Sequence, residues 1–233
     1  MLFRSDDLKL VTSWVLLLKT AKNNLYSYEL FHGRATLPDR VFYDKIMNMT
    51  NRKQIIVMMG GPGVGKGTFS DMLMARRPFK HIEAGALLRA MPADSEIGKL
   101  ISAGDLVPDN LVCDLMVAQI TDDDIIMDGF PRTISQAKWL VKNYADKYDI
   151  QILFLNTDDE TLIQRIQKRV RTGSHRADDA TIKTIRHRLE NFHKTTMPAV
   201  DWLRTAPGIT FSEIDAAGDV NDNFADITSA LGM

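Results

Sequence analysis

Short apolar runs alternate along most of the chain with segments whose apolar residues recur at helical spacing. The runs are short enough for buried strands and lie at 54–59, 124–128, 150–155 and 209–214, and a further short segment lies at 80–83. The helical pattern lies at 69–77, in a stretch that ends near 103–104, and at 111–118, 162–169, 185–198 and 220–231. Strands that alternate with helices predict a parallel sheet covered on both faces. We therefore expect an α/β fold, a three-layer αβα arrangement around a parallel five-stranded sheet.

The first 51 residues carry a pattern of their own. Leu8, Val11 and Val15 share one helical face, a second piece covers 25–31, and Pro38 could open a third helix. Aromatic side chains argue against disorder, and acidic residues argue against a mitochondrial transit peptide. We expect 1–51 to be a helical N-terminal extension that either packs on the rest of the chain or serves as an address. As an address, residues 1–50 would bind a protein partner.

A glycine-rich stretch at 60–68 separates the first strand after the extension from its following helix. Its spacing fits Gly-x-x-x-x-Gly-Lys, the pattern of a phosphate-binding loop (P-loop). Glycines let successive N–H groups point at one anion, and the helix start adds the positive end of its dipole. Lys66 would reach the outer phosphates as a point charge. The residues expected to bind ATP here are Gly61, Gly63, Val64, Gly65, Lys66, Gly67 and Thr68.

Asp128 ends the predicted strand at 124–128 and is the candidate for holding Mg²⁺. An acid at the end of a strand beside a phosphate-binding loop holds the metal either directly or through water. Gly67 stands where the loop pattern has Ser or Thr, so that hydroxyl ligand is missing. We therefore expect Mg²⁺ to rely on Asp128, through water, together with Thr68 and phosphate oxygens.

Arginines indicate that the second substrate also carries phosphate. Guanidinium groups bind phosphate in a forked geometry and suit the spread charge of a phosphoryl group in transfer. The candidates are Arg89, Arg132, Arg169 and Arg176. No catalytic base is evident, and a phosphate monoester acceptor needs none because its oxygen is largely ionised at pH 7.

Composition limits the remaining function classes. The formal net charge of the 233 residues is −1, which gives no indication of a nucleic-acid partner. Cys113 is the sole cysteine, so an internal disulfide and a multi-cysteine structural zinc site are excluded. A single thiol is typical of a reducing compartment, and we expect a cytoplasmic protein. No apolar run approaches the roughly 20 residues of a membrane span.

From about residue 53 onward the motifs resemble the nucleoside monophosphate kinases, most closely the adenylate kinase family. The motifs agree in order and lie at 60–68, 85–89, 106–108, 128–132, 176–179 and 188–190. The resemblance implies a kinase domain at 52–233, with a small helical insertion that binds the nucleoside monophosphate (NMP) at about 83–112. It also implies a short lid at about 169–179.

The resemblance also implies roles for single residues. Catalytic residues along the transfer path would be Lys66, Arg132, Arg169, Arg176 and Arg188. The NMP site would use Ala84, Arg89, Val107, Gly129, Arg132, Gln136, Arg176 and Arg188. Arg169 and Gly218 would contact ATP, the latter through backbone beside the adenine.

The activity implied is reversible phosphoryl transfer from MgATP to AMP, giving two ADP. Ala84 stands where adenylate kinases usually have Thr and resembles the UMP/CMP kinases, whereas Gln136 follows the adenylate kinase pattern. UMP or CMP therefore stays open as the acceptor, although AMP is favoured. An alternative of another class is a nucleotide-binding scaffold with vestigial catalysis. Some adenylate kinases carry N-terminal extensions that act as addresses, including to flagella, which is the alternative to a cytoplasmic location.

Overall fold

The structure is a computed structural model that describes residues 52–103, 105–172 and 181–233. Residues 53–233 form one compact unit. The helices expected within 1–51, most of the expected lid and Arg176 lie outside the described residues. In the described part, no helix is both long and apolar enough to cross a membrane.

Five parallel strands form the sheet, in the order β2-β3-β1-β4-β5. The strands are β1 (Lys53–Gly60), β2 (Lys80–Glu83), β3 (Ile125–Asp128), β4 (Tyr148–Asn156) and β5 (Ile209–Asp215). In β1 the five residues from Ile55 to Met59 are all buried, because helices cover both faces of the sheet. The expectation of a parallel five-stranded sheet is confirmed.

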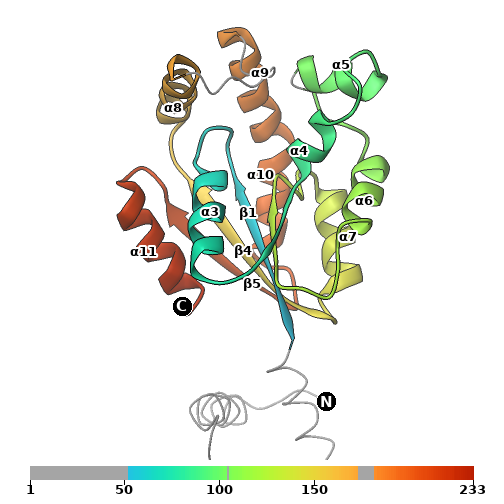
Figure 1. The fold of residues 1–233 in the computed structure, drawn as a ribbon, viewed down its shortest axis with the longest axis vertical. Helices are drawn as coiled ribbons and strands as arrows, with labels where there is room; N and C mark the ends of the chain where they lie inside the picture. Colours follow the sequence, from blue (N-terminus) through green and yellow to red (C-terminus); the bar gives the residue numbers. More distant parts are fainter. Residues whose placement is uncertain (1–51, 104, 173–180) are drawn as a thin grey trace, which may run out of the picture. The chain divides into compact units, whose positions relative to one another are not determined.

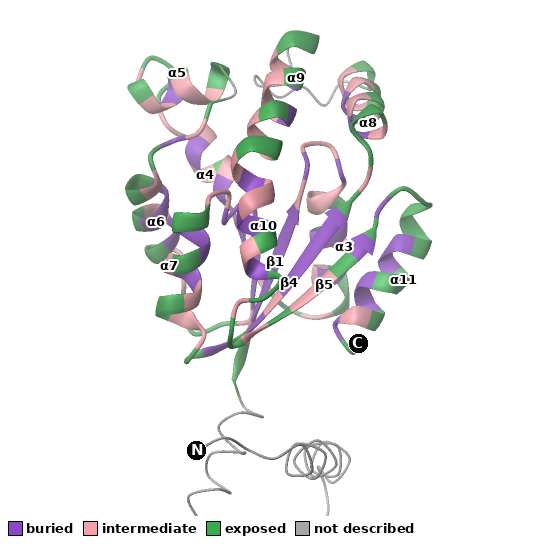
Figure 2. Ribbon diagram, turned by 180° about the vertical axis from the view of Figure 1, so that it is seen from behind, coloured by how far each residue is buried: buried purple, intermediate pink, exposed green. Residues whose placement is uncertain are grey.

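Helices cover both faces of this sheet. They are α3 (Lys66–Arg76), α4 (Ala84–Arg89), α5 (Glu96–Ala103), α6 (Asp109–Val117), α7 (Ile134–Tyr144), α8 (Asp159–Arg171), α9 (Ile182–Asn191), α10 (Met197–Leu203) and α11 (Val220–Ala230). Figures 1 and 2 show α3 and α11 on one face and α7 and α10 on the other. Alternate residues of β1 belong to two cores, Ile56 to the same cluster as Leu73 and Val57 to the same cluster as Leu140. The three-layer αβα architecture is therefore confirmed.

Helix α7 is absent from the helices that the apolar pattern predicts. It begins after Thr133, whose side chain accepts a hydrogen bond from the backbone N–H of Gln136. The buried face comprises Gln136, Ala137 and Leu140, so a polar residue interrupts the apolar repeat on which the prediction relied. The parallel pairing of the flanking strands nevertheless requires a crossover of this kind.

The helix expected to run through to Pro198 contains a π-helical turn. Helix α9 continues through η3 (Phe192–Thr196) into α10 without a break. Pro198 lies in the first turn of α10 and has no N–H to donate to the preceding turn, which accounts for the wider turn there. The hydroxyl of Thr196 in this turn donates to the carbonyl of Arg132 at 3.1 Å. The π turn therefore contacts the segment that carries a predicted site arginine.

Candidate active site

A pocket lies where β1, β2 and β3 end, the usual ligand position in an open parallel sheet. The predicted site residues that line it are Lys66, Arg89, Val107, Gly129, Arg132, Gln136 and Arg188. Ala84 is buried at the start of α4 and is not among the lining residues. Arg169 and Gly218, expected on the ATP side, do not line the pocket either.

The glycine-rich loop turns sharply between β1 and α3. Gly63 and Gly65 have φ angles of 87° and 108°, in the region that other residues rarely adopt. A Cβ added at Gly63 would lie 2.7 Å from Cγ1 of Ile166 and 2.9 Å from the carbonyl oxygen of Leu162. Gly65 caps α3, so the first N–H groups of that helix lie directly beyond the loop. This backbone is suited to bind an anion.

Lys66 is the first residue of α3 and folds over the loop. Its Nζ donates to the carbonyl oxygens of Gly60, at 2.9 Å, and Gly61, at 3.1 Å. A Cβ added at Gly67 would meet no atom within 4 Å, so the space beside this residue is open. Thr68 is exposed. The loop therefore brings one cation and the positive end of a helix to the same place.

Asp128 is only 7 % exposed at the end of β3, and its Cα pairs with Met58 of β1 and with Glu83 of β2. Within 52–103, 105–172 and 181–233, its carboxylate forms no hydrogen bond or ion pair. A buried carboxylate of this kind is stabilised by a cation. The described residues contain no group of three or more His, Cys, Asp or Glu that could hold a metal by itself. One carboxylate near a phosphate site nevertheless fits Mg²⁺, which takes one or two carboxylates, phosphate oxygens and waters.

Two predicted arginines approach the pocket from different segments. Arg89 ends α4 and forms an ion pair with Glu83 at the end of β2. The Nε of Arg132 donates to the carbonyl of Gly129 at 2.9 Å. Gly129 has a φ of 76°, and an added Cβ would lie 3.0 Å from Nη2 of Arg132. The glycine therefore lets this guanidinium group lie against the backbone.

Gln136 lies deeper, with an exposed fraction of 3 %. Its Oε1 accepts from the backbone N–H of Arg132 at 2.7 Å, and its Nε2 donates to Oδ1 of Asp109 at 2.7 Å. The hydroxyl of Thr133 donates to the other oxygen of Asp109 at 2.8 Å. Asp109 and Thr133 are not among the predicted site residues. Asp109 directly follows the motif at 106–108, which is the signal that could have found it.

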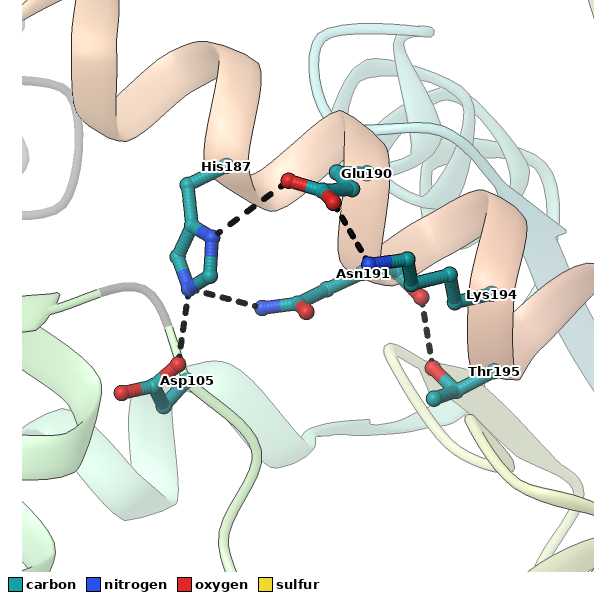
Figure 3. A network of polar contacts seen from close by, with 6 residues as sticks. All are labelled: Asp105, His187, Glu190, Asn191, Lys194 and Thr195. Carbon is teal, nitrogen blue, oxygen red and sulfur yellow. Dashed lines mark hydrogen bonds and ion pairs between the residues drawn. The ribbon is translucent and has the colours of Figure 1, made fainter.

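The rim of the pocket joins α9 to the loop after α5. Figure 3 shows His187 pointing toward Asp105, with Nε2 2.7 Å from Oδ1. The Nδ2 of Asn191 lies 3.3 Å from the same ring nitrogen. Asp105, Asn191 and Arg188 all line the pocket. This polar contact connects the wall that carries Val107 to the helix that carries Arg188.

A separate contact connects the glycine-rich loop to the segment between β5 and α11, where Gly218 lies. Arg165 of α8 donates from Nη2 to the carbonyl of Ala216 at 2.8 Å. Its Nη1 donates to the carbonyl of Val64 in the loop at 3.4 Å. The carbonyl of Gly218 accepts from Nδ2 of Asn223 at 3.2 Å. Arg165, to which the sequence assigns no role, therefore holds together the two segments expected to bind ATP.

Cys113 on α6 is not a nucleophile in this site. Burial, followed by the charges of Asp109 and Asp114, raises the pKa of its thiol from 9.0 to about 11. The thiol is therefore protonated at neutral pH, and its side chain is buried in the core.

The parallel sheet, the glycine-rich loop before α3 and the cation-lined pocket define a phosphate-binding-loop protein of the nucleotide kinase class. A family model described as adenylate kinase matches residues 58–207. The adenylate kinase of Bacteroides thetaiotaomicron is 36 % identical over 188 residues, which cover 76 % of this chain and 97 % of that protein. The adenylate kinase of Porphyromonas gingivalis is 42 % identical over 160 residues, covering 64 % and 81 %. That of Thermus thermophilus is 31 % identical over 187 residues, covering 77 % and 98 %.

The chain belongs to the adenylate kinase family. It is accordingly a nucleoside monophosphate kinase, and members of this family use Mg²⁺ with ATP.

Proposed function

We propose that this protein transfers the terminal phosphoryl group of MgATP reversibly to AMP, giving two ADP, and so maintains the balance of adenine nucleotides. One observation carries the proposal: Lys66, Arg89, Arg132 and Arg188 line a single pocket although they come from four separate segments. Cations gathered from so many elements suit two phosphate chains that meet end to end. The names of the relatives support AMP as the acceptor.

In the proposed reaction, an oxygen of the AMP phosphate attacks the terminal phosphorus of ATP. The new P–O bond forms as the bond to the ADP leaving group breaks, and no proton needs to be removed from the ionised acceptor. Lys66 and the arginines would hold the two phosphates in line and offset their charge. Arg169 and Arg176 would complete this set when the lid at about 169–179 and the NMP-binding unit at about 83–112 close and exclude water.

Mg²⁺ would be held beside the glycine-rich loop by Asp128, through water, with Thr68 nearby. The absence of a hydroxyl at Gly67 and the buried carboxylate of Asp128 support this arrangement. When bound, the ion neutralises charge on the phosphates of ATP during transfer. The remaining steps of binding and orientation would fall to the arginines, to Gln136 and to the loop backbone.

A coupled assay with ATP and AMP, UMP, CMP or GMP in turn tests the acceptor. We expect AMP to give the highest kcat/KM. A higher value for UMP or CMP would overturn the choice of AMP and give Ala84 more weight than Gln136. A chain that binds nucleotides but transfers to none of the four would instead be a scaffold.

The match of the family model begins at residue 58, after residues 1–51. We propose that residues 1–51 are an N-terminal extension. We propose a cytoplasmic enzyme whose extension either packs on the kinase domain or directs it to a partner, for example in a flagellum. Deleting residues 1–50 and following both activity and cellular position separates the two. An altered position with unchanged activity would exclude simple packing.

A further inference from the structure

We propose that Asp109 is a positioning residue that locks the side-chain amide of Gln136 in one orientation, and that this lock makes the acceptor site discriminate against uracil. The inference rests on the proposed function and deepens it. It states which bases the acceptor site rejects and which side-chain group rejects them.

Each end of the Gln136 side-chain amide has a partner that can play only one hydrogen-bonding role. Nε2 donates to a carboxylate oxygen of Asp109, which can only accept, and Oε1 accepts from the backbone N–H of Arg132, which can only donate. Rotating the amide by 180° would bring two acceptors together at Asp109 and two donors together at Arg132. Because Gln136 is buried, water cannot relieve either clash.

Asp109 is itself held in place. Its Oδ2 accepts from the hydroxyl of Thr133, the residue that caps α7. It occupies the first turn of α6, where the helix dipole stabilises a negative charge. The carboxylate therefore joins the start of α6 to the start of α7, and it has one oxygen for Thr133 and one for Gln136.

Two hydrogen-bonding positions remain on the Gln136 amide. Nε2 keeps one N–H and Oε1 keeps one lone pair, and the lock fixes their order. Adenine presents an amino donor beside a ring-nitrogen acceptor, and cytosine presents the same order on its Watson–Crick edge. Uracil presents a carbonyl acceptor beside a ring N–H donor, the reverse order. An amide free to turn would suit both orders, whereas a locked amide suits only one.

The lock therefore makes a prediction that a merely structural role does not. Loss of Asp109 should weaken AMP and CMP, because the amide is no longer held in the order that they need, and it should leave UMP unchanged or improve it. If Asp109 only joins α6 to α7, its loss should weaken all three acceptors equally or none of them.

The experiment measures kcat and KM for AMP, CMP and UMP at saturating ATP with the full chain. For Asp109→Ala we expect KM to rise about tenfold for AMP and for CMP, with kcat changed less than about threefold, the loss of one buried charged hydrogen bond. The AMP:UMP ratio of kcat/KM should fall about tenfold, while the AMP:CMP ratio should stay within about threefold. Asp109→Asn keeps an acceptor oxygen at this position and should lose less discrimination than Asp109→Ala.

Two controls separate the alternatives. Asp114→Asn removes the same charge from an exposed position of the same helix and should leave all three ratios unchanged. In a Gln136→Leu background, Asp109→Ala should cause no further change in the AMP:UMP ratio, because the amide it orients is gone. If Asp109→Ala does not fold, Asp109→Ser, which is too short to reach Gln136, is the variant to measure.

Equal losses for AMP, CMP and UMP, or an unchanged AMP:UMP ratio in Asp109→Ala, would overturn the inference. Failure of the proposed function has a different outcome, since the unmodified protein would then not phosphorylate AMP in the first place.

Discussion

The Nζ of Lys66 lies 2.9 Å from the carbonyl oxygen of Gly60, so the cation of the glycine-rich loop is held by the end of the strand that precedes it. The carbonyls of Gly60 and Gly61 both hold the ammonium group of Lys66, which lines the pocket. A bound terminal phosphate would be a charged partner for the same group.

Replacement of Lys66 by Met tests the role of this ammonium group. The variant keeps an unbranched side chain one atom shorter and removes the charge, so we expect kcat to fall by about 10²–10³, the loss typical of one group that stabilises charge in the transition state. Lys138→Met, at an exposed position of α7, is the matched control and should be fully active. Normal turnover by Lys66→Met would contradict the role assigned to Lys66.

Arg89→Lys tests whether the acceptor phosphate is held by a guanidinium fork. A lysine keeps the charge and loses the forked geometry, so KM for AMP should rise about tenfold or more while KM for ATP stays nearly constant. Steady-state kinetics with each substrate varied in turn make the measurement. Arg76→Lys, at an exposed position of α3, should change neither constant. A rise confined to the KM for ATP would mean that Arg89 binds ATP and not the acceptor, which would contradict the role assigned to it.

Asp128→Asn tests the proposed metal site. We expect chelation of Mg²⁺ to stop transfer by the unmodified protein, and we expect the Asn variant to need a higher Mg²⁺ concentration for half-maximal rate, because a neutral amide is a weaker ligand for a hard cation. A titration of rate against Mg²⁺ checks this. Asp71→Asn, an exposed acid on α3, provides the comparison. Identical titration curves for Asp128→Asn and the unmodified protein would exclude Asp128 from the metal site.

Glu213 gives a prediction for stability against pH. A hydrogen bond from Arg204, 2.6 Å long, lowers the pKa of this carboxyl group in the folded protein. A lowered folded-state pKa adds stability above the unfolded-state value of 4.5, and that stability is lost as the pH falls through the folded-state pKa. The pair is about one-third exposed, so Glu213→Gln should lower the free energy of unfolding at pH 7 by at most about 1 kcal/mol.

Thermal unfolding of Glu213→Gln and the unmodified protein at a series of pH values makes the comparison. The difference in Tm, about 2–4 °C at most at pH 7, should shrink as the solution becomes more acidic than the folded-state pKa. A difference that grows on acidification would mean that the sign assigned to the pKa shift is wrong.

The fold could be predicted because the central strands β1 and β3 are buried on both faces and therefore read as unbroken apolar runs. The glycine-rich loop could also be predicted, because the backbone turns sharply at Gly60, Gly63 and Gly65 with φ angles that other residues rarely adopt. Helix α7 was missed because Gln136 occupies a buried position where the helical pattern expects an apolar residue. Tertiary contacts, here with Asp109 and Arg132, decide that a polar side chain is buried, and the local pattern contains no trace of them.

In the candidate site, too, residues within motifs could be predicted and residues placed by tertiary contacts could not. Residues within motifs, such as Lys66 and Arg132, could be named from their spacing, and seven of the predicted residues line one pocket. Asp109 and Arg165 could not be assigned, because an acid at a helix start and an arginine on a helix face are both ordinary surface features. Their contacts join segments 27 and 51 residues apart, a distance that spacing within a motif does not cover.

In the proposed reaction one pocket holds two nucleotides whose phosphate chains meet end to end. Titration calorimetry with a bisubstrate mimic, two adenosines joined by five phosphates, tests it most directly. The account predicts one mimic bound per chain, with tighter binding than ATP or AMP alone and competition against both. A well-folded chain that takes up no mimic, or one that binds it in competition with ATP but not with AMP, would contradict the account.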